Sequence, residues 1–329
     1  MNNDDIWGIT TFFNPANYKS KKENYNIFRK SSKRQGLRLI AIELKFDDYP
    51  FELKKNDAEI VIQIRTQERN ILWQKEALLN IGLKKLPNEC KKVIWIDCDI
   101  VFQNEKWVKK TSELLEKYKV VQPFSYCVKL SKGIASVENI DNLEFGLEEM
   151  KKIHGIVFGF YTFKDFSFNE YIKHGHVGFV WAIRRDIIEK NGFYDHAISG
   201  SGDLIMSSAF LNLKPDYFKK NFPIKMVRHF EKWVKKISNY VKGETYYVDG
   251  FVYHLWHGDT KNRYYDNRHE ILFCNNFDPN FDIVKNENNI WEWSNNKRKL
   301  KSSIKKYFWL RREDRGFLNF LIFLKNKIL

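Results

Sequence analysis

The stretch KKVIWIDCDIVF, residues 91–102, places two aspartates, Asp97 and Asp99, at the end of an apolar run. A short run that is apolar almost throughout is typical of a strand buried on both faces of a parallel sheet. Two carboxylates at the end of such a strand have three interpretations: a metal site for a nucleotide, the nucleophile and acid of a phosphatase, or two solvated charges. The stretch alone does not decide between them.

Apolar, β-branched segments alternate with helical patterns on both sides of this strand. Strands are predicted over 6–13, 37–46 and 58–64, and helices over 17–35 and 68–86. This alternation predicts an α/β fold with a doubly wound, mixed and mainly parallel sheet. Ligands of such sheets bind at the carboxyl ends of the strands, which is where Asp97 and Asp99 are expected.

The second half of the chain has a looser pattern. VGFVWAIRRDIIEKNGF, residues 177–193, predicts a strand and then a helix, and YYVDGFVYHLWH, residues 246–257, predicts one last strand. Residues 131–175 are long and mixed, which is typical of a functional or mobile segment. We expect this segment to close over a bound ligand.

Composition narrows the class of protein. The chain has 329 residues, of which 43% are hydrophobic and 16% aromatic, so it can bury a core and is not globally disordered. Its net charge of +15 indicates an anionic partner, such as nucleotide phosphates, nucleic acid or a membrane surface, or a chain that is simply rich in lysine. Its four scattered cysteines form no CxxC pair, which argues against a zinc–thiolate site or a disulfide framework and favours a reducing compartment.

The two ends of the chain suggest where it resides. The start, MNNDDIWGIT, lacks the features of a signal peptide, and no apolar window is long enough to span a membrane, so we expect a cytoplasmic protein. Residues 297–329 form a basic, amphipathic and helical tail. The tail either lies on an anionic membrane surface, giving peripheral attachment at the inner face, or packs on the body.

A second group of polar residues lies in VYHLWHGDTKNRYYDNR, residues 252–268. His254 and His257 would point to opposite faces of a continuing strand, but a turn at Leu255 and Trp256 lets both imidazoles face one ion. With carboxylates they suit a divalent cation such as Mn²⁺ or Mg²⁺. Basic side chains suited to phosphate oxygens follow at Lys261, Arg263 and Arg268.

A third group is Gly200-Ser201-Gly202, with Asp203 at the start of a predicted helix. Aspartate at a helix start is commonly an N-cap. The functional interpretation is a general base that deprotonates a hydroxyl group of an acceptor.

Four motifs occur in the order found in GT-A-fold glycosyltransferases: LWQKEALLNIGL (72–83), Asp97-Cys98-Asp99, the block 177–203, and HLWHGDTKN (254–262). Over about residues 6–275 the chain most resembles the β-1,4-galactosyltransferases and their polypeptide N-acetylgalactosaminyltransferase relatives. The resemblance implies a Rossmann-like GT-A domain over 1–296, with a nucleotide-binding half (1–125) and an acceptor-binding half (126–296). It also implies metal-dependent transfer from a nucleotide sugar, most often a UDP-sugar, to a glycan or lipid-linked hydroxyl.

The resemblance also implies roles for single residues of the donor site. Asp99 would bind the metal, with His254 and His257 in the places of the family's methionine and histidine ligands. Asp97 would face the ribose or sugar of the donor. Further donor contacts are implied for Lys75, in the place of a nucleotide-contacting arginine, for Glu43, in the place of a uridine-binding acid, and for Asn14 in the nucleotide loop.

On the acceptor side, Asp203 matches the catalytic aspartate of the family's G-G-E-D motif. Gly202 stands where the family has a glutamate that helps to hold the acceptor sugar, which leaves the acceptor open. Because the family has inverting and retaining branches, the stereochemistry is open too. Trp181 is either a platform on which a sugar stacks or an ordinary core tryptophan.

Two other classes of protein compete with this one. In a haloacid-dehalogenase-like phosphatase Asp97 would attack phosphorus, but that motif normally opens its domain, whereas 96 residues precede Asp97 here. The Mg²⁺-binding pattern that would follow Gly202-Asp203 also fails, since Ser207 stands at the required place. A nucleic-acid-binding protein is disfavoured because no helix-turn-helix, zinc finger or RNP motif is present.

Overall fold

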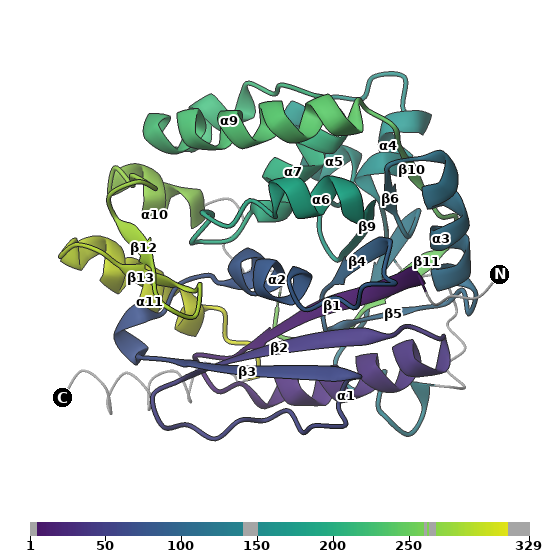
Figure 1. Ribbon diagram of the computed structural model, residues 1–329, viewed down its shortest axis with the longest axis horizontal. Coiled ribbons are helices and arrows are strands. Elements are labelled where there is room, and N and C mark those ends of the chain that lie inside the picture. The colour runs from purple at the N-terminus through teal and green to yellow at the C-terminus, as the bar shows by residue number, and fades with distance from the viewer. Residues whose placement is uncertain (1–4, 141–150, 260–261, 263–267, 315–329) are drawn as a thin grey trace.

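The computed structural model describes residues 5–140, 151–259, 262 and 268–314, and in these residues a seven-stranded sheet forms the centre (Figure 1). Its order is β10-β6-β9-β4-β1-β2-β3, and all neighbours are parallel except β9, which runs antiparallel between β4 and β6. The strands are β1 (Ile6–Phe13), β2 (Leu39–Phe46), β3 (Ile60–Thr66), β4 (Lys92–Ile96), β6 (Val120–Gln122), β9 (Val180–Arg184) and β10 (Thr245–Tyr247). The predicted fold class, a doubly wound, mixed and mainly parallel α/β sheet, is confirmed.

Helices cover both faces of this sheet (Figure 1). One face carries α2 (Lys75–Leu83), α6 (Arg185–Asn191), α7 (Gly202–Phe210) and α9 (Ile224–Val241), and the other carries α1 (Lys19–Arg34) and α3 (Trp107–Lys117). Successive side chains of β4 enter opposite cores: Trp95 packs with the first group of helices and Ile94 with the second. Because a strand alternates its side chains between two faces, both must be apolar in a sheet covered twice.

A second sheet lies beside the first, with the order β5-β11-β7-β8. Its strands are β5 (Ile100–Phe102), β7 (Tyr126–Lys129), β8 (Lys152–His154) and β11 (Phe251–His254). The two long strands predicted over 91–102 and 246–257 are therefore wrong, because each divides between the sheets. Asp97–Asp99 joins β4 to β5, and Gly250, with a φ of 145°, precedes β11.

The predicted helix over 68–86 is shorter than expected. A 3₁₀ turn, η2 (Glu68–Asn70), precedes it, and α2 begins only at Lys75. Tertiary hydrogen bonds hold the intervening chain out of the helix: Trp73 donates its backbone N–H to Ile198 O, and the Gln74 side chain bonds both backbone groups of Trp291. Lys75 and Glu76 therefore lie in the first turn of α2.

The C-terminal tail packs on the body as far as the structure describes it. Helix α11 (Arg298–Leu310) buries Leu300, Ile304 and Phe308. Packing on the body was one of the two interpretations of residues 297–329, and residues 315–329 lie outside the described part. The remaining elements are α4 (Ile156–Thr162), η4 (Phe168–Glu170), α5 (Tyr171–His174), α8 (Tyr217–Asn221), α10 (Arg268–Cys274), β12 (Ile283–Lys285) and β13 (Trp291–Trp293).

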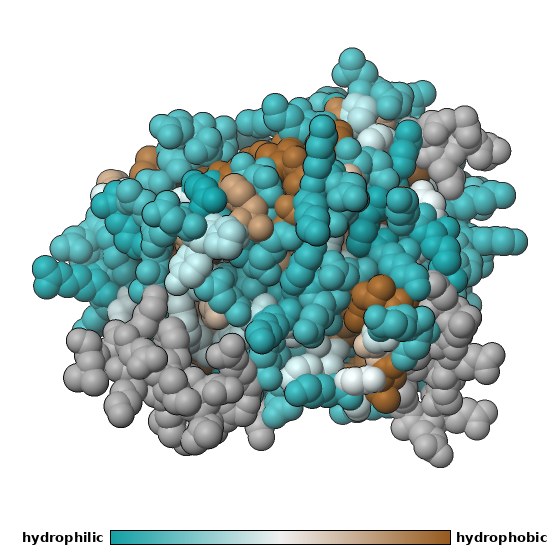
Figure 2. All heavy atoms as spheres, turned by 90° about the horizontal axis from the view of Figure 1, so that it is seen from below, coloured by the Kyte–Doolittle hydropathy of each residue, from teal (hydrophilic) through white to brown (hydrophobic). Residues whose placement is uncertain are grey.

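The surface is that of a highly charged chain. Figure 2 shows one face on which hydrophilic side chains predominate and hydrophobic ones gather in separate patches, which is ordinary for a folded domain. Within the described ranges, no helix has the length and apolar character needed to cross a bilayer.

Candidate active site

A cavity of about 420 Å³ opens where the two sheets meet. Its wall includes Asn14, which follows β1, and Asp97, Cys98 and Asp99, which follow β4. The carboxyl ends of strands are the usual ligand site of open α/β sheets. The volume also lies within the range of about 300–1,000 Å³ that is typical of small-molecule sites.

The structure brings together the three predicted metal ligands, Asp99, His254 and His257. Their ligand atoms all lie within 4.8 Å of one another. His257 Nε2 is 2.8 Å from His254 Nε2 and 3.2 Å from Asp99 Oδ2. This arrangement arises because β11 ends at His254, and the backbone N–H of Leu255 then bonds Asp99 O at 2.8 Å.

The chemistry of these three side chains fits a divalent cation. A carboxylate oxygen and two imidazole nitrogens that face one another form a mixed donor set, which suits transition ions such as Mn²⁺ better than Mg²⁺. Two neutral imidazole nitrogens at 2.8 Å can form only one hydrogen bond, whereas a cation accepts the lone pairs of both. These three side chains would hold such an ion at the wall of the cavity, within reach of a ligand bound there.

Lys75 lies between Asp97 and Asp203 on another wall of the same cavity. Its Nζ is 2.7 Å from Asp97 Oδ1 and 2.8 Å from Asp203 Oδ2. Burial alone would lower the pKa of Lys75, but Asp203 and Asp97 raise it above its ordinary value, so this ammonium stays charged. Burial raises the pKa of Asp97 to about 6 against the lowering by Lys75, with Asp203 and Asp99 adding to the rise.

Asp203 does not cap its helix. Helix α7 begins at Gly202 after Ser201, which has a φ of 79° and makes no side-chain capping bond. The Asp203 carboxylate instead uses Oδ2 for Lys75, while its Oδ1 is buried with no hydrogen-bond partner among the described residues. Asp203 therefore presents its carboxylate to the cavity that it lines.

Glu76 is a site residue that the sequence interpretation missed. It lines the cavity, and a Cβ at position 202 would lie 2.2 Å from its Oε1, so its carboxylate fills the space that Gly202 leaves. Burial raises its pKa to about 8 against the lowering by Lys75, and Asp203 adds to the rise. Helix α2 thus places a carboxyl group beside Gly202, where the resemblance leads one to expect an acid. The signal that could have found it is the glycine in the place of that acid.

Two predicted contacts are not brought to the cavity. Trp181 is 1% exposed, stacks on Trp95 with their planes at 13°, and donates its indole N–H to Val177 O. It leaves no ring face for a sugar, so the role as a stacking platform is wrong and the alternative of a core tryptophan is correct. Glu43 is fully buried, and it accepts hydrogen bonds from the backbone N–H groups of Glu52 and Leu53. Its carboxylate stabilises that loop and is not available to uridine.

The other predicted donor contacts differ in their placement. Asn14 lines the cavity, and its side chain both accepts from and donates to the backbone of Tyr18, which fixes the turn after β1. Lys261 and Arg263 lie outside the described residues. Of the basic cluster, Arg268 reaches the cavity, and three further cations that the sequence did not single out also line it: Lys21, Lys129 and Arg311.

The described part of the predicted segment 131–175 also borders the cavity, while its residues 141–150 lie outside the described residues. Ile153, Tyr171 and Ile172 line it, and His176 follows just beyond. Burial lowers the pKa of His176 to about 3, with Lys129 and Lys75 adding to the effect, so this imidazole is neutral. It stacks on Phe179 at 3.8 Å between ring centroids.

Comparison with known proteins yields similarity of structure only. No protein-family model and no curated protein matches the chain. Among solved structures, glucosyl-3-phosphoglycerate synthase from Mycobacterium tuberculosis, crystallised with Mn²⁺ and UDP, is 10% identical with a TM-score of 0.44, over 82% of this chain and 78% of that one. S. aureus TarS 1-349 with UDP-GlcNAc is 11% identical with a TM-score of 0.37, and the match spans 62% of this chain and about half, 52%, of that one.

A third similar structure is 4-diphosphocytidyl-2C-methyl-D-erythritol synthase from Anaerococcus prevotii, 14% identical with a TM-score of 0.38, over 75% of this chain and 88% of that one. At these identities and TM-scores the likeness does not extend to function. The function of this chain has to be inferred from its own site.

Proposed function

We propose that this protein is a metal-dependent glycosyltransferase of the GT-A kind. It would move a sugar from a nucleotide-sugar donor, a UDP-sugar, to a hydroxyl group of an acceptor. The observation that carries the proposal is the position of the three side chains that can bind a cation, Asp99, His254 and His257. They converge in the cavity that also holds the ion-paired Asp97 and Asp203. A bound divalent ion would supply Lewis-acid charge for a departing diphosphate.

Other residues of the cavity would bind the phosphates and the ribose or sugar of the donor. Positively charged side chains on the cavity wall, among them Lys21, Lys129 and Arg268, are placed to bind phosphate oxygens. Lys261 and Arg263 would add to this charge. Asp97, held by Lys75 at 2.7 Å, would face the ribose or the sugar of the donor.

On the acceptor side, Asp203 would accept the proton of the attacking hydroxyl if the reaction inverts the anomeric configuration. Lys75 keeps its carboxylate in place. Glu76, which holds its proton at neutral pH because its pKa is raised to about 8, would donate a hydrogen bond to the acceptor beside Gly202. The proposed acceptor is a glycan or a lipid-linked hydroxyl. The proposed setting is the cytoplasm, with peripheral membrane contact through the C-terminal tail, residues 297–329.

The test is release of UDP from a panel of UDP-sugars with Mn²⁺, with and without EDTA. The proposal predicts release that EDTA stops and that Mn²⁺ restores better than Mg²⁺. A phosphatase that uses Asp97 as nucleophile would instead release inorganic phosphate from a simple phosphate monoester. Phosphate release, or no binding of any UDP-sugar with any divalent metal, would contradict the proposal.

A further inference from the structure

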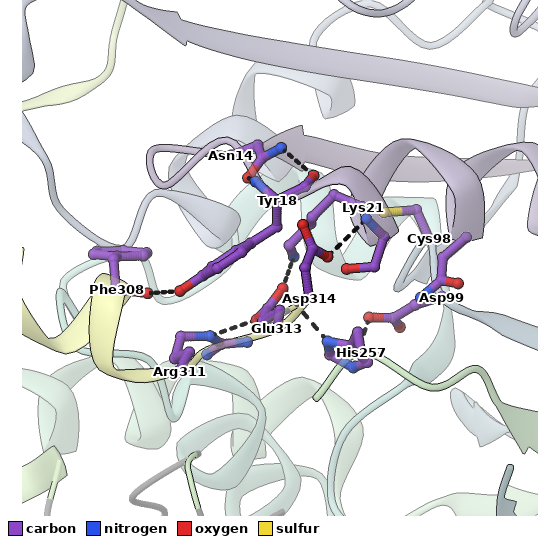
Figure 3. A network of polar contacts seen from close by, with 12 residues as sticks. Asn14, Tyr18, Lys21, Cys98, Asp99, His257, Phe308, Arg311, Glu313 and Asp314 are labelled. Carbon is purple, nitrogen blue, oxygen red and sulfur yellow. Dashed lines mark hydrogen bonds and ion pairs between the residues drawn. The ribbon is translucent and has the colours of Figure 1, made fainter. Parts of the chain in front are cut away.

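Residues 308–314, which we call the C-terminal strap, comprise the last three residues of α11 and the four that follow, and they lie against the start of α1 (Figure 3). The Tyr18 hydroxyl lies 2.9 Å from Phe308 O and 3.0 Å from Trp309 O, and it accepts the backbone N–H of Arg312 at 3.1 Å. Asp314 accepts the backbone N–H groups of Lys19 and Ser20, a favourable place for a carboxylate because helix N-termini carry positive partial charge. The strap is thus anchored to the body.

The strap also packs tightly against the loop that carries His257. Gly258 has a φ of 88°, and a Cβ there would lie 2.8 Å from Arg312 O and 2.9 Å from the Cα of Glu313. Such distances to backbone atoms leave no space for a side chain, so only glycine permits this approach. Glycine at position 258, next to the candidate metal ligand His257, therefore allows the strap to pack against this loop.

Glu313 is the residue that the strap brings to this point. It is completely buried, and its carboxylate bonds Arg311 Nε at 2.6 Å and lies 3.8 Å from Lys21 Nζ. Its Oε2 is 3.6 Å from His257 Nδ1, on the side of the imidazole ring opposite to Asp99 (Figure 3). A buried carboxylate is costly unless cations and donors surround it, and Arg311 and Lys21 supply that positive charge here.

We propose that Glu313 is a positioning residue for His257. Its negative charge favours a proton on Nδ1, which would leave the lone pair of Nε2 available to a cation held together with Asp99 and His254. In metal sites the second nitrogen of a ligating histidine usually faces a carboxylate or a carbonyl, which fixes the tautomer and ring orientation. The inference rests on the proposed metal-dependent function, and it assigns part of the metal site to the C-terminal tail.

The first test needs no metal. In ¹⁵N-histidine NMR spectra of the metal-free protein, two carboxylates compete for the His257 proton: Glu313 Oε2 lies 3.6 Å from Nδ1 and Asp99 Oδ2 lies 3.2 Å from Nε2. Glu313→Gln should shift this proton towards Nε2 relative to wild type, and Asp99→Asn should shift it towards Nδ1. The same proton distribution in Glu313→Gln as in wild type overturns the inference, and so does a proton that stays on Nε2 in Asp99→Asn, a test that leaves position 313 intact.

The second test is Mn²⁺ binding without nucleotide, followed by electron paramagnetic resonance, with folding of each variant checked by circular dichroism. Glu313→Gln should weaken Mn²⁺ binding about 10- to 100-fold, the usual effect of removing such a partner. The control is Glu292→Gln, whose acid bonds Asn286 and does not line the cavity, and whose affinity should not change. Unchanged affinity in Glu313→Gln, with Mn²⁺ bound by the wild type, overturns only the positioning role. A wild type that binds no Mn²⁺ overturns the proposed function.

Discussion

The carboxylates in two corners of one cavity have different kinds of partner. In the lysine corner, Lys75 pairs with Asp97 and Asp203, so the protein itself supplies the cation. In the metal corner, Asp99 faces His254 and His257, which are donor groups that converge on a small space. Asp97 and Asp99 are one residue apart in the sequence but belong to different corners.

The difference arises from the backbone. Asp97 follows β4 of the main sheet and its N–H bonds Phe179 O, while Asp99 precedes β5 of the second sheet and its carbonyl accepts the Leu255 N–H. The chain between two sheets thus directs one carboxylate to α2 and the other to the end of β11. We infer that the metal corner requires an external cation for its function and that the lysine corner does not.

The largest effect should come from removing a donor of the metal corner. Asp99→Ala or His257→Ala should abolish Mn²⁺-dependent UDP binding in titration calorimetry, because two protein donors no longer form a competitive site. His229→Ala is the control, since His229 contacts Tyr194 and does not line the cavity. Normal Mn²⁺-dependent UDP binding in both variants would show that the metal corner does not bind the ion.

The next effect concerns the lysine corner alone. Asp203→Asn should reduce sugar transfer about 10²- to 10⁴-fold, the usual contribution of a positioned base, and leave UDP binding unchanged. The measurement is transfer to acceptor alongside calorimetry on the same preparation. If transfer persists at the wild-type rate, Asp203 is not a base and only pairs with Lys75.

Lys75→Met tests whether the charge of Lys75 compensates the carboxylates of Asp97 and Asp203. It leaves the partly buried Asp97 and Asp203 without their shared cation, which should lower the free energy of unfolding by about 1–3 kcal/mol, less than the loss for a fully buried pair. The control Lys305→Met breaks a partly exposed ion pair with Glu68 and should cost about 0–1 kcal/mol. Urea denaturation measures both, and equal losses would mean that Lys75 is not structurally required.

The smallest effect is a change in pH dependence. Between the ordinary glutamate pKa of 4.5 and the raised pKa of about 8, the folded protein keeps the Glu76 proton while the unfolded chain loses it. The unfolded state binds fewer protons there, so the free energy of unfolding falls as pH rises through this window. Glu76→Gln should remove this fall, so its free energy of unfolding should change less than that of the wild type between about pH 5 and 8.

Urea denaturation at both ends of this window measures the effect. Glu189→Gln, a change at an exposed acid paired with Arg185, is the control and should follow the wild type. Parallel pH profiles for Glu76→Gln and wild type would show that Glu76 is ionised in the folded protein.

Local patterns were sufficient to predict part of the metal corner from sequence. The apolar run before Asp97, the two histidines and the glycine after them are each visible within a dozen residues, and Asp97 and His254 lie at the ends of β4 and β11. The division of two predicted strands between sheets was not predicted, because periodicity does not report which neighbour a strand pairs with.

The missed and mistaken residues share a cause. Glu76 reaches the cavity from the largely buried helix α2, and Glu313 from a strap that meets His257 across 55 intervening positions, so no local pattern reports them. Trp181 and Glu43 have the right residue types for sugar and uridine contacts, but burial in tertiary contacts with Trp95 and with the loop around Leu53 removes them from the cavity. Residue type and order alone do not determine access.

The most direct test of the central claim, that neighbouring aspartates serve different corners, is Mn²⁺ binding to a matched pair of variants. Asp97→Asn and Asp99→Asn make the same chemical change one residue apart. Electron paramagnetic resonance titration of Mn²⁺ should show near wild-type affinity in Asp97→Asn and loss of binding in Asp99→Asn. Equal losses, or loss in Asp97→Asn alone, would contradict the division of the cavity into a lysine corner and a metal corner.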